Sequence, residues 1–286
     1  MNQPDQQPSW PSRRQTLAAL AALSAGGAAA LAGCTSTDGT GGTDQSGTTT
    51  AGASGAPSGS AGASSASAGA SSPSSSPSSL AGGVPTGADI TAGPASSGGV
   101  ALTFHGAGDP KVTQDVVKEL ASAGAFITVL AVGTWLSEDP QMARLLLDGG
   151  HELGNHTWSH RDMTSLSPAD TAAEVQRAAA ELKTLTGSTG RWFRPSATTA
   201  STPVIRAAAM AAGYGACLMY DVDPMDNRDP GASAIASRLL GAVQPGSIVS
   251  LHLGHAGTRD ALPAMLDGLR QKGLRAVTAS QLLGVR

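Results

Sequence analysis

Two histidines spaced four residues apart are the best candidates in this chain for metal chemistry. His156 and His160 lie in the stretch HELGNHTWSH, with Asn155 and Thr157 beside them. One helical or tight-loop turn brings residues i and i+4 onto the same face, so both imidazoles could reach one divalent cation. The alternative is a pair of ordinary surface or capping histidines, as in most isolated HxxxH sequences. Other residues of the chain favour the metal interpretation.

Short apolar segments alternate with amphipathic ones over the last two thirds of the chain. The apolar segments typical of buried strands are 100–104, 126–131, 151–153, 192–193, 216–220, 248–253 and 274–277. Between them, helix-start signals stand at Pro110, Asp139–Pro140 and Ser167–Pro168. Strand–helix alternation repeated about seven times predicts an α/β fold whose parallel sheet closes into a barrel.

The candidate functional residues come at the carboxyl ends of these predicted strands. In chain order they are His105, His156, His160, Arg194, Asp223 and His252. Active sites of barrels converge at that end of the strands. Histidines with purely structural roles would have no reason to share one rim, so their placement indicates a functional site.

Five short motifs follow one another through this region. They are LTFHGAGDP at 102–110, HELGNHTWSH at 151–160, RWFRP at 191–195, DVDPMD at 221–226 and SLH at 250–252. Their order and spacing resemble the polysaccharide deacetylase family (the NodB homology domain), carbohydrate esterases that remove acetyl groups from glycans. The resemblance covers residues 99–286. It implies a distorted barrel of seven to eight β/α units in a single catalytic-type domain.

The resemblance assigns roles to several of these residues. It implies a divalent metal, zinc above all, held by His156 and His160, which polarises the acetyl carbonyl and positions a water. Arg194 matches the arginine that holds the catalytic base. His252 matches the general acid that protonates the departing amine.

Two further roles concern the acid and the sugar. Asp223 or Asp226 would orient His252. Trp158, between the two metal histidines, is the candidate for stacking on a sugar ring, with core packing as its other possible role. The implied function is a metal-dependent hydrolase that removes acetyl groups from a cell-wall or extracellular polysaccharide.

The first motif departs from the family pattern, which is TFDDGP. The family uses the first aspartate as base and the second as third metal ligand, and those positions hold His105 and Gly106. An imidazole can act as a base. Alternatively His105 is a third nitrogen ligand in a His₃ site and Asp109 is the base, or His105 only fills vacated space. The last interpretation leaves a second function open, a catalytically silent carbohydrate-binding protein tethered to the membrane.

The first 98 residues resemble an export signal followed by a linker. Residues 1–33 resemble a twin-arginine lipoprotein signal, with SRRQTL at 12–17 and the lipobox LAGC ending at Cys34. We therefore expect export, lipidation of Cys34 and an extracytoplasmic protein anchored to the membrane by lipid. Residues 34–98 consist mainly of Ser, Gly, Ala, Thr and Pro, which predicts a disordered tether.

Residues 99–286 form the predicted polysaccharide deacetylase-like domain, and their charge is nearly balanced. Two arginines and four aspartates of the chain's 18 basic and 21 acidic residues lie before residue 99. Without a basic tract, nucleic acid is excluded as a partner and a neutral polysaccharide is favoured. Cys34 and Cys217 are the only cysteines, so a disulfide framework is excluded.

Overall fold

The computed structural model describes residues 86–285. The predicted signal segment 1–33, the lipidation site Cys34 and the linker up to residue 85 lie outside the described residues, so these assignments stay predictions. Among residues 86–285, no helix has the length and apolar character needed to cross a membrane.

Parallel strands form the centre of the described region. Five of them share one sheet in the order β4-β3-β2-β6, with β7 also paired to β2. Two short strands, β1 and β5, form a second sheet. The strands are β1 (Asp89–Ile90), β2 (Gly99–Gly106), β3 (Thr128–Ala131), β4 (Glu152–Asn155), β5 (Cys217–Leu218), β6 (Ile248–His252) and β7 (Arg275–Val277).

Single parallel bridges link the two sheets. Asn155 bridges to Phe193, Phe193 bridges to Cys217, and Val222 bridges to Val249. The predicted strand at 192–193 is therefore reduced to one bridging residue. The links run from β4 through Phe193 to β5 and back to β6, which is the order that a barrel requires. The α/β fold is confirmed, whereas closure into one continuous barrel stays a prediction.

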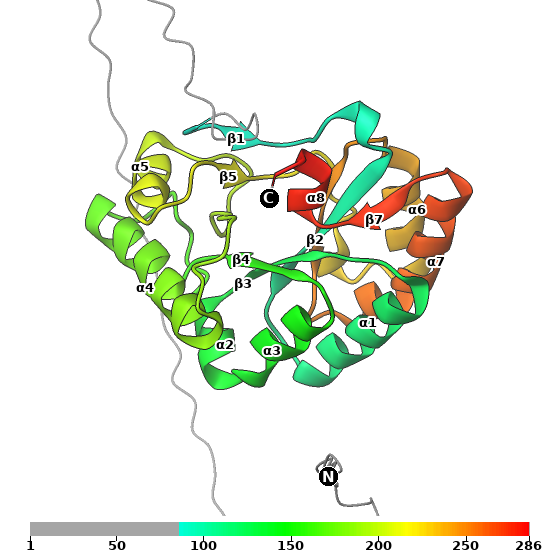
Figure 1. Ribbon diagram of the computed structural model, residues 1–286, viewed down its shortest axis with the longest axis horizontal. Coiled ribbons are helices and arrows are strands. Elements are labelled where there is room, and N and C mark those ends of the chain that lie inside the picture. The colour runs from blue at the N-terminus through cyan, green and yellow to red at the C-terminus, as the bar shows by residue number, and fades with distance from the viewer. Residues whose placement is uncertain (1–85, 286) are drawn as a thin grey trace, which may run out of the picture. The chain divides into compact units, whose positions relative to one another are not determined.

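Helices surround these strands, except that the last one, α8 (Ala279–Leu283), lies among them and packs with Ala101 and Ile248 (Figure 1). Within the described residues they are α1 (Pro110–Ala123), α2 (Gly133–Glu138), α3 (Gln141–Asp148), α4 (Pro168–Thr186), α5 (Pro203–Ala211), α6 (Ala232–Ala242), α7 (Ala256–Gln271) and α8 (Ala279–Leu283), with short 3-10 turns η1 (Ala95–Ser97) and η2 (Asp226–Arg228). The predicted starts of α1 and α4 are confirmed. Asp109 and Ser167 cap them with side-chain oxygens, and a proline occupies the first turn of each.

Strand β2 positions the first site residue. Side chains alternate along a strand, and Val100, Leu102 and Phe104 are buried in the main hydrophobic core under the helices. Thr103 and His105 therefore point to the opposite, inner side, next to β6 and Arg194. His105 is thereby placed at the carboxyl edge of the sheet.

Regular structure is found before the predicted domain boundary at residue 99, within the predicted linker. Asp89 and Ile90 of β1 pair in parallel with Cys217 and Leu218 of β5. Their neighbours in sequence are the small residues typical of the linker, so a strand of two residues leaves no periodic signal in the sequence.

Candidate functional site

A hollow of about 460 Å³ lies at the carboxyl ends of the strands. It is lined by His105, His160, Thr164, Arg194, Pro195, Ala197, Thr198, Thr199, Tyr220, Asp223, Asn227, Ser250 and His252. The structure thus brings together residues from the ends of β2 and β6 and residues that follow β4, the bridging Phe193 and β5. The sequence argument about a shared rim is supported by this geometry.

Four imidazoles cluster at the base of the hollow. The His105 ring stacks on His156 with centroids 4.1 Å apart, and His252 stands edge-on to His105 at 4.5 Å. His160 lies edge-on to His156 at 4.9 Å. Rings this close cannot all be protonated without strong mutual repulsion.

Hydrogen bonds fix the tautomers of two of these rings. Arg194 Nη1 lies 3.2 Å from His105 Nε2, and because a guanidinium only donates, Nε2 accepts. The proton of neutral His105 is therefore on Nδ1, which donates to His252 Nε2 at 2.9 Å. His252 Nδ1 donates in turn to Asp226 Oδ1 at 2.8 Å. One chain of hydrogen bonds runs from Arg194 through His105 and His252 to Asp226.

Burial keeps His105 and His156 neutral. Desolvation lowers the pKa of both rings well below the ordinary value, and nearby His160 and Arg194 lower it further. Burial also lowers the pKa of Arg194 to about 9, an effect opposed by Tyr220 and Asp223. Arg194 remains a cation at neutral pH.

Arg194 is held mainly by neutral acceptors. Its Nε donates to Leu218 O at 2.7 Å and its Nη2 to Met219 O at 2.9 Å. Nη2 also donates to Thr103 Oγ1 at 2.8 Å. The guanidinium makes no ion pair with a carboxylate among the described residues, although the resemblance implies an aspartate at position 105.

The turn that carries His156 and His160 is an irregular loop with backbone strain. Thr157 and His160 have positive φ values of 69° and 56°, which cost of order 1–3 kcal/mol for residues other than glycine. Asn155 Oδ1 accepts the Thr157 N–H at 2.8 Å, and the Thr157 hydroxyl bonds to Ser196 at 3.0 Å. These contacts hold the two imidazoles on one side of the loop.

His156 is oriented as a ligand would be. Its Nδ1 donates to Arg194 O at 2.9 Å, which leaves the lone pair on Nε2. That Nε2 is buried and has no hydrogen-bond partner. A backbone acceptor on the second ring nitrogen is the usual support of a metal-bound histidine.

A third protein ligand does not accompany this pair. Among the described residues, no group of three or more His, Cys, Asp or Glu side chains is arranged to hold a metal. The lone pair of His105 faces the Arg194 cation, so His105 does not complete the His₃ site that was one of the alternatives for this residue. At Gly106 a Cβ would meet Val129 Cγ1 at 2.7 Å. His156 and His160, whose ring centroids lie 4.9 Å apart, remain as the two candidate ligands.

Asp226 is the partner of His252. Its carboxylate is fully buried and accepts bonds from His252 Nδ1, the His252 N–H and Thr258 Oγ1. Burial alone would raise the pKa of Asp226, but the bonds from His252 and Thr258 hold it below its ordinary value. Asp223 lines the hollow, where its Oδ1 accepts the Met225 N–H. The two sequence candidates for orienting His252 are thus distinguished.

Asp109 and Trp158 do not take the roles considered for them. Asp109 is exposed and caps α1 by accepting the Lys111 N–H at 2.8 Å, and it does not line the hollow. The Arg177 guanidinium lies 3.8 Å over the Trp158 ring, which packs at Gly133. With that face covered, Trp158 is not a sugar platform for this hollow.

Several polar residues of the site were missed by the sequence reasoning. Glu174 accepts both the N–H and the hydroxyl of Ser159, next to His160. Tyr220, Asn227 and Ser250 line the hollow. Tyr220 and Asn227 flank the motif at 221–226 and Ser250 lies inside the motif SLH, whereas Glu174 lies inside a helix whose polar face gives no such signal.

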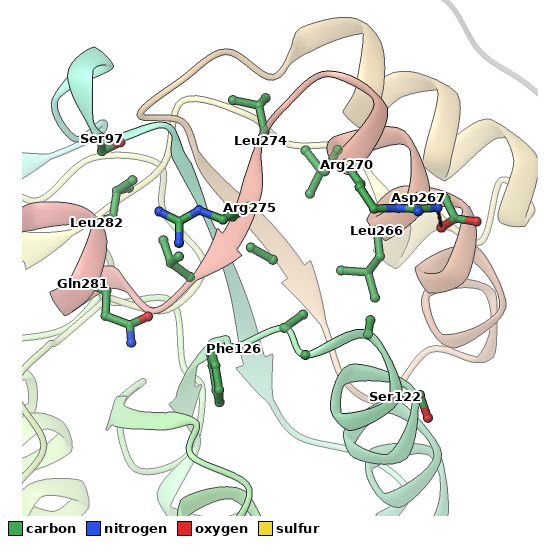
Figure 2. A pocket seen from close by; sticks show the side chains of 16 residues that line it. Ser97, Ser122, Phe126, Leu266, Asp267, Arg270, Leu274, Arg275, Gln281 and Leu282 are labelled. Carbon is green, nitrogen blue, oxygen red and sulfur yellow. Dashed lines mark hydrogen bonds and ion pairs between the residues drawn. The ribbon is translucent and has the colours of Figure 1, made fainter.

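A second hollow, of about 760 Å³, lies at the amino ends of the strands. Its lining includes Phe126, Arg275 and Leu282 (Figure 2). None of the predicted site residues borders it. The polar hollow at the carboxyl ends is therefore the candidate site.

Comparisons with known proteins find relatives of one family. The sequence profile of the family described as Polysaccharide deacetylase matches residues 92–216. A chitooligosaccharide deacetylase of Sinorhizobium fredii is 30% identical over 164 residues, covering 54% of this chain and 72% of the relative. A peptidoglycan-N-acetylglucosamine deacetylase of Bacillus cereus is 29% identical over 194 residues, covering 64% and 87%.

A solved structure with a similar fold belongs to a protein that is described as a pseudoenzyme. A CE4 family pseudoenzyme from Bacillus anthracis superposes with a TM-score of 0.64 at 25% identity, covering 68% of each chain. Similarity in this group therefore extends both to deacetylases and to a pseudoenzyme.

Proposed function

Because this chain belongs to the polysaccharide deacetylase family, we propose that it removes acetyl groups from a cell-wall or extracellular polysaccharide at the hollow. The pair of His252 and Asp226 is the observation that carries this proposal. A buried carboxylate held by three hydrogen bonds orients one imidazole at the edge of a polar hollow. Such a pair is suited to moving a proton to and from a reacting group.

His252 Nε2 is the proton-transfer atom. It takes a proton from water as the water oxygen bonds to the acetyl carbon. It then gives that proton to the leaving nitrogen as the C–N bond breaks, so the products are acetate and a free amine. Asp226 stabilises the imidazolium formed in between. The His105 N–H now bonded to Nε2 must give its place to the water.

The finer parts of this proposal concern the metal. A divalent cation, zinc above all, would be held by His156 and His160, and it would polarise the acetyl carbonyl. The unpartnered Nε2 of His156 supports this assignment. Two protein ligands instead of three imply weaker binding than at a catalytic zinc site of the usual kind.

A silent carbohydrate-binding protein is the second candidate. Two observations favour it: the lone pair of His105 is occupied by the bond from Arg194, and position 106 has no side chain. Neither His105 nor Gly106 can then act as the family's aspartates do.

Acetate release tests the two candidates against each other. The purified protein would be incubated with N-acetylated chitooligosaccharides and with peptidoglycan, alongside Asp226→Asn. We expect acetate from the wild type and a fall in kcat of about 10²- to 10⁴-fold in the variant. Saturable glycan binding without acetate would replace the hydrolase by the silent binder.

We also propose that the chain is exported and anchored to the membrane through lipid on Cys34. The lipobox and the twin arginines of the sequence support this. The wild-type protein should then be found in the membrane fraction and be solubilised by detergent, whereas Cys34→Ser should be found in the soluble fraction. A wild-type protein found only in the soluble fraction would refute the anchor.

A further inference from the structure

Asp89 of β1 holds a residue that is 112 positions away in the chain. Its Oδ2 accepts the N–H of Ser201 at 2.9 Å, and its Oδ1 accepts the Ser201 hydroxyl. From the other side, Arg206 Nη1 donates to Ser201 O at 2.6 Å and to Ser201 Oγ at 2.9 Å. A buried serine is thereby fixed between a carboxylate and a guanidinium, and charge-assisted bonds of this kind are strong.

Ser201 ends the segment that forms one wall of the hollow. Residues Ala197, Thr198 and Thr199 of that segment line the hollow. The other end of the segment is fixed at Ser196, whose hydroxyl donates to Arg161 O at 2.5 Å and bonds to Thr157.

Between these two attachments the wall has little support of its own. Ala197 has a positive φ of 54°, and the hydroxyl of Thr198 bonds only within the segment, to Ala200. Ala197 and Thr199 are exposed. The position of the wall therefore depends on its ends, at Ser196 and at Ser201.

The same short strand also contacts the support of Arg194. Ala88 O accepts the Cys217 N–H at 3.1 Å, and Ile90 O accepts the Met219 N–H at 2.8 Å. The Met219 carbonyl is one of the acceptors of Arg194. Residues 88–90 lie outside the stretch 92–216 that matches the family profile, so the profile gives no information on them.

We propose that Asp89 is a positioning residue of the substrate hollow: acting through Ser201, it sets the place of the wall at residues 197–199. The effect on substrate rests on the function proposed above, whereas the effect on the wall does not. Because Asp89 touches neither the imidazoles nor the hollow, its loss should weaken substrate binding far more than proton transfer.

Amide hydrogen exchange and glycan kinetics together test this proposal. In Asp89→Ala we expect the Ala200 amide, which donates to Thr198 Oγ1 within the wall, to exchange about tenfold faster or more than in the wild type. KM for N-acetylchitopentaose should rise about fivefold or more while kcat stays within about twofold. Asp89→Asn keeps one acceptor oxygen, so its exchange rate and KM should lie between those of the wild type and Asp89→Ala. Ser201→Ala should resemble Asp89→Asn in both. Asp148→Asn, which replaces an exposed carboxylate on α3, is the matched control.

The outcomes separate this inference from the proposed function. Unchanged exchange of the Ala200 amide in Asp89→Ala would overturn the positioning role. Faster exchange with unchanged KM, or with unchanged Kd of the pentasaccharide, would also overturn it. If the wild type releases no acetate, the deacetylase proposal fails, but the exchange measurement and the Kd still decide the role of Asp89.

Discussion

Arg194 Nη1 donates to His105 Nε2 across 3.2 Å, so a buried cation faces a neutral imidazole. The other bonds of the guanidinium end on Leu218 O, Met219 O and Thr103 Oγ1, which are also uncharged. A buried cation that bonds to no carboxylate loses much of its hydration without full compensation. The contact of Arg194 with His105 is therefore a point where this chain gives up stability relative to an arginine–carboxylate pair.

The variant His105→Asp should be more stable than the variant His105→Asn. A carboxylate beside Arg194 would form a charge-assisted bond, and we expect a gain of about 1–3 kcal/mol in the free energy of unfolding over His105→Asn. The asparagine variant has nearly the same shape, so their difference isolates the charge. Urea denaturation at pH 7.5 measures both. Equal stability of the two variants would show that Arg194 does not sense the charge.

Acid should destabilise the protein through the neutral histidines. The pKa values of His105 and His156 are lowered in the fold, while the unfolded chain takes up protons near pH 6.5. Their contribution is fully present above pH 6.5 and is lost as pH falls from there toward the folded pKa values, at up to about 1.4 kcal/mol per pH unit for each ring. Denaturation between pH 7.5 and 5 should show this slope, and His156→Gln should reduce it. An equal slope in both proteins would contradict the assignment.

Metal binding should depend on His156. Zinc titrations followed by calorimetry should show weak binding to the wild type and none to His156→Ala, because the free Nε2 is lost. His255→Ala is the control, since His255 pairs with Asp229 and lies outside the pair of proposed ligands. Equal zinc affinity of all three proteins would remove His156 from the metal proposal.

The sequence predicted which residues meet at the rim, but not how they bond. His156, Arg194 and His252 each follow a buried segment, and parallel strands bring their ends to one edge, so their convergence could be foreseen. The partner of His252 could not be chosen, because Asp223 and Asp226 stand three residues apart around a turn. That turn passes through Met225 at a positive φ of 57°.

Other features depend on packing that leaves no local signal. The sequence left Trp158 open between stacking on a sugar and packing in the core, and Arg177 from α4 covers its face. The pairing of Asp89 with Ser201 joins positions 112 residues apart. Contacts of this kind are set by the tertiary fold and cannot be read from hydrophobic periodicity.

Gly106→Asp should be costly by itself and tolerated with a second change. A Cβ at Gly106 would lie 2.7 Å from Val129 Cγ1 and 3.0 Å from the Trp135 ring, and overpacking of this kind costs about 1–3 kcal/mol. Val129→Ala removes the nearer atom. We therefore expect Gly106→Asp to lower the urea midpoint, and the double variant to lower it by less than the two single changes would add up to. Val129→Ala alone is the reference for the loss of the methyl groups. If the changes in urea midpoint were strictly additive, Val129 would not be the residue that excludes a side chain at position 106. The absence of a third metal ligand at that position would then have another cause.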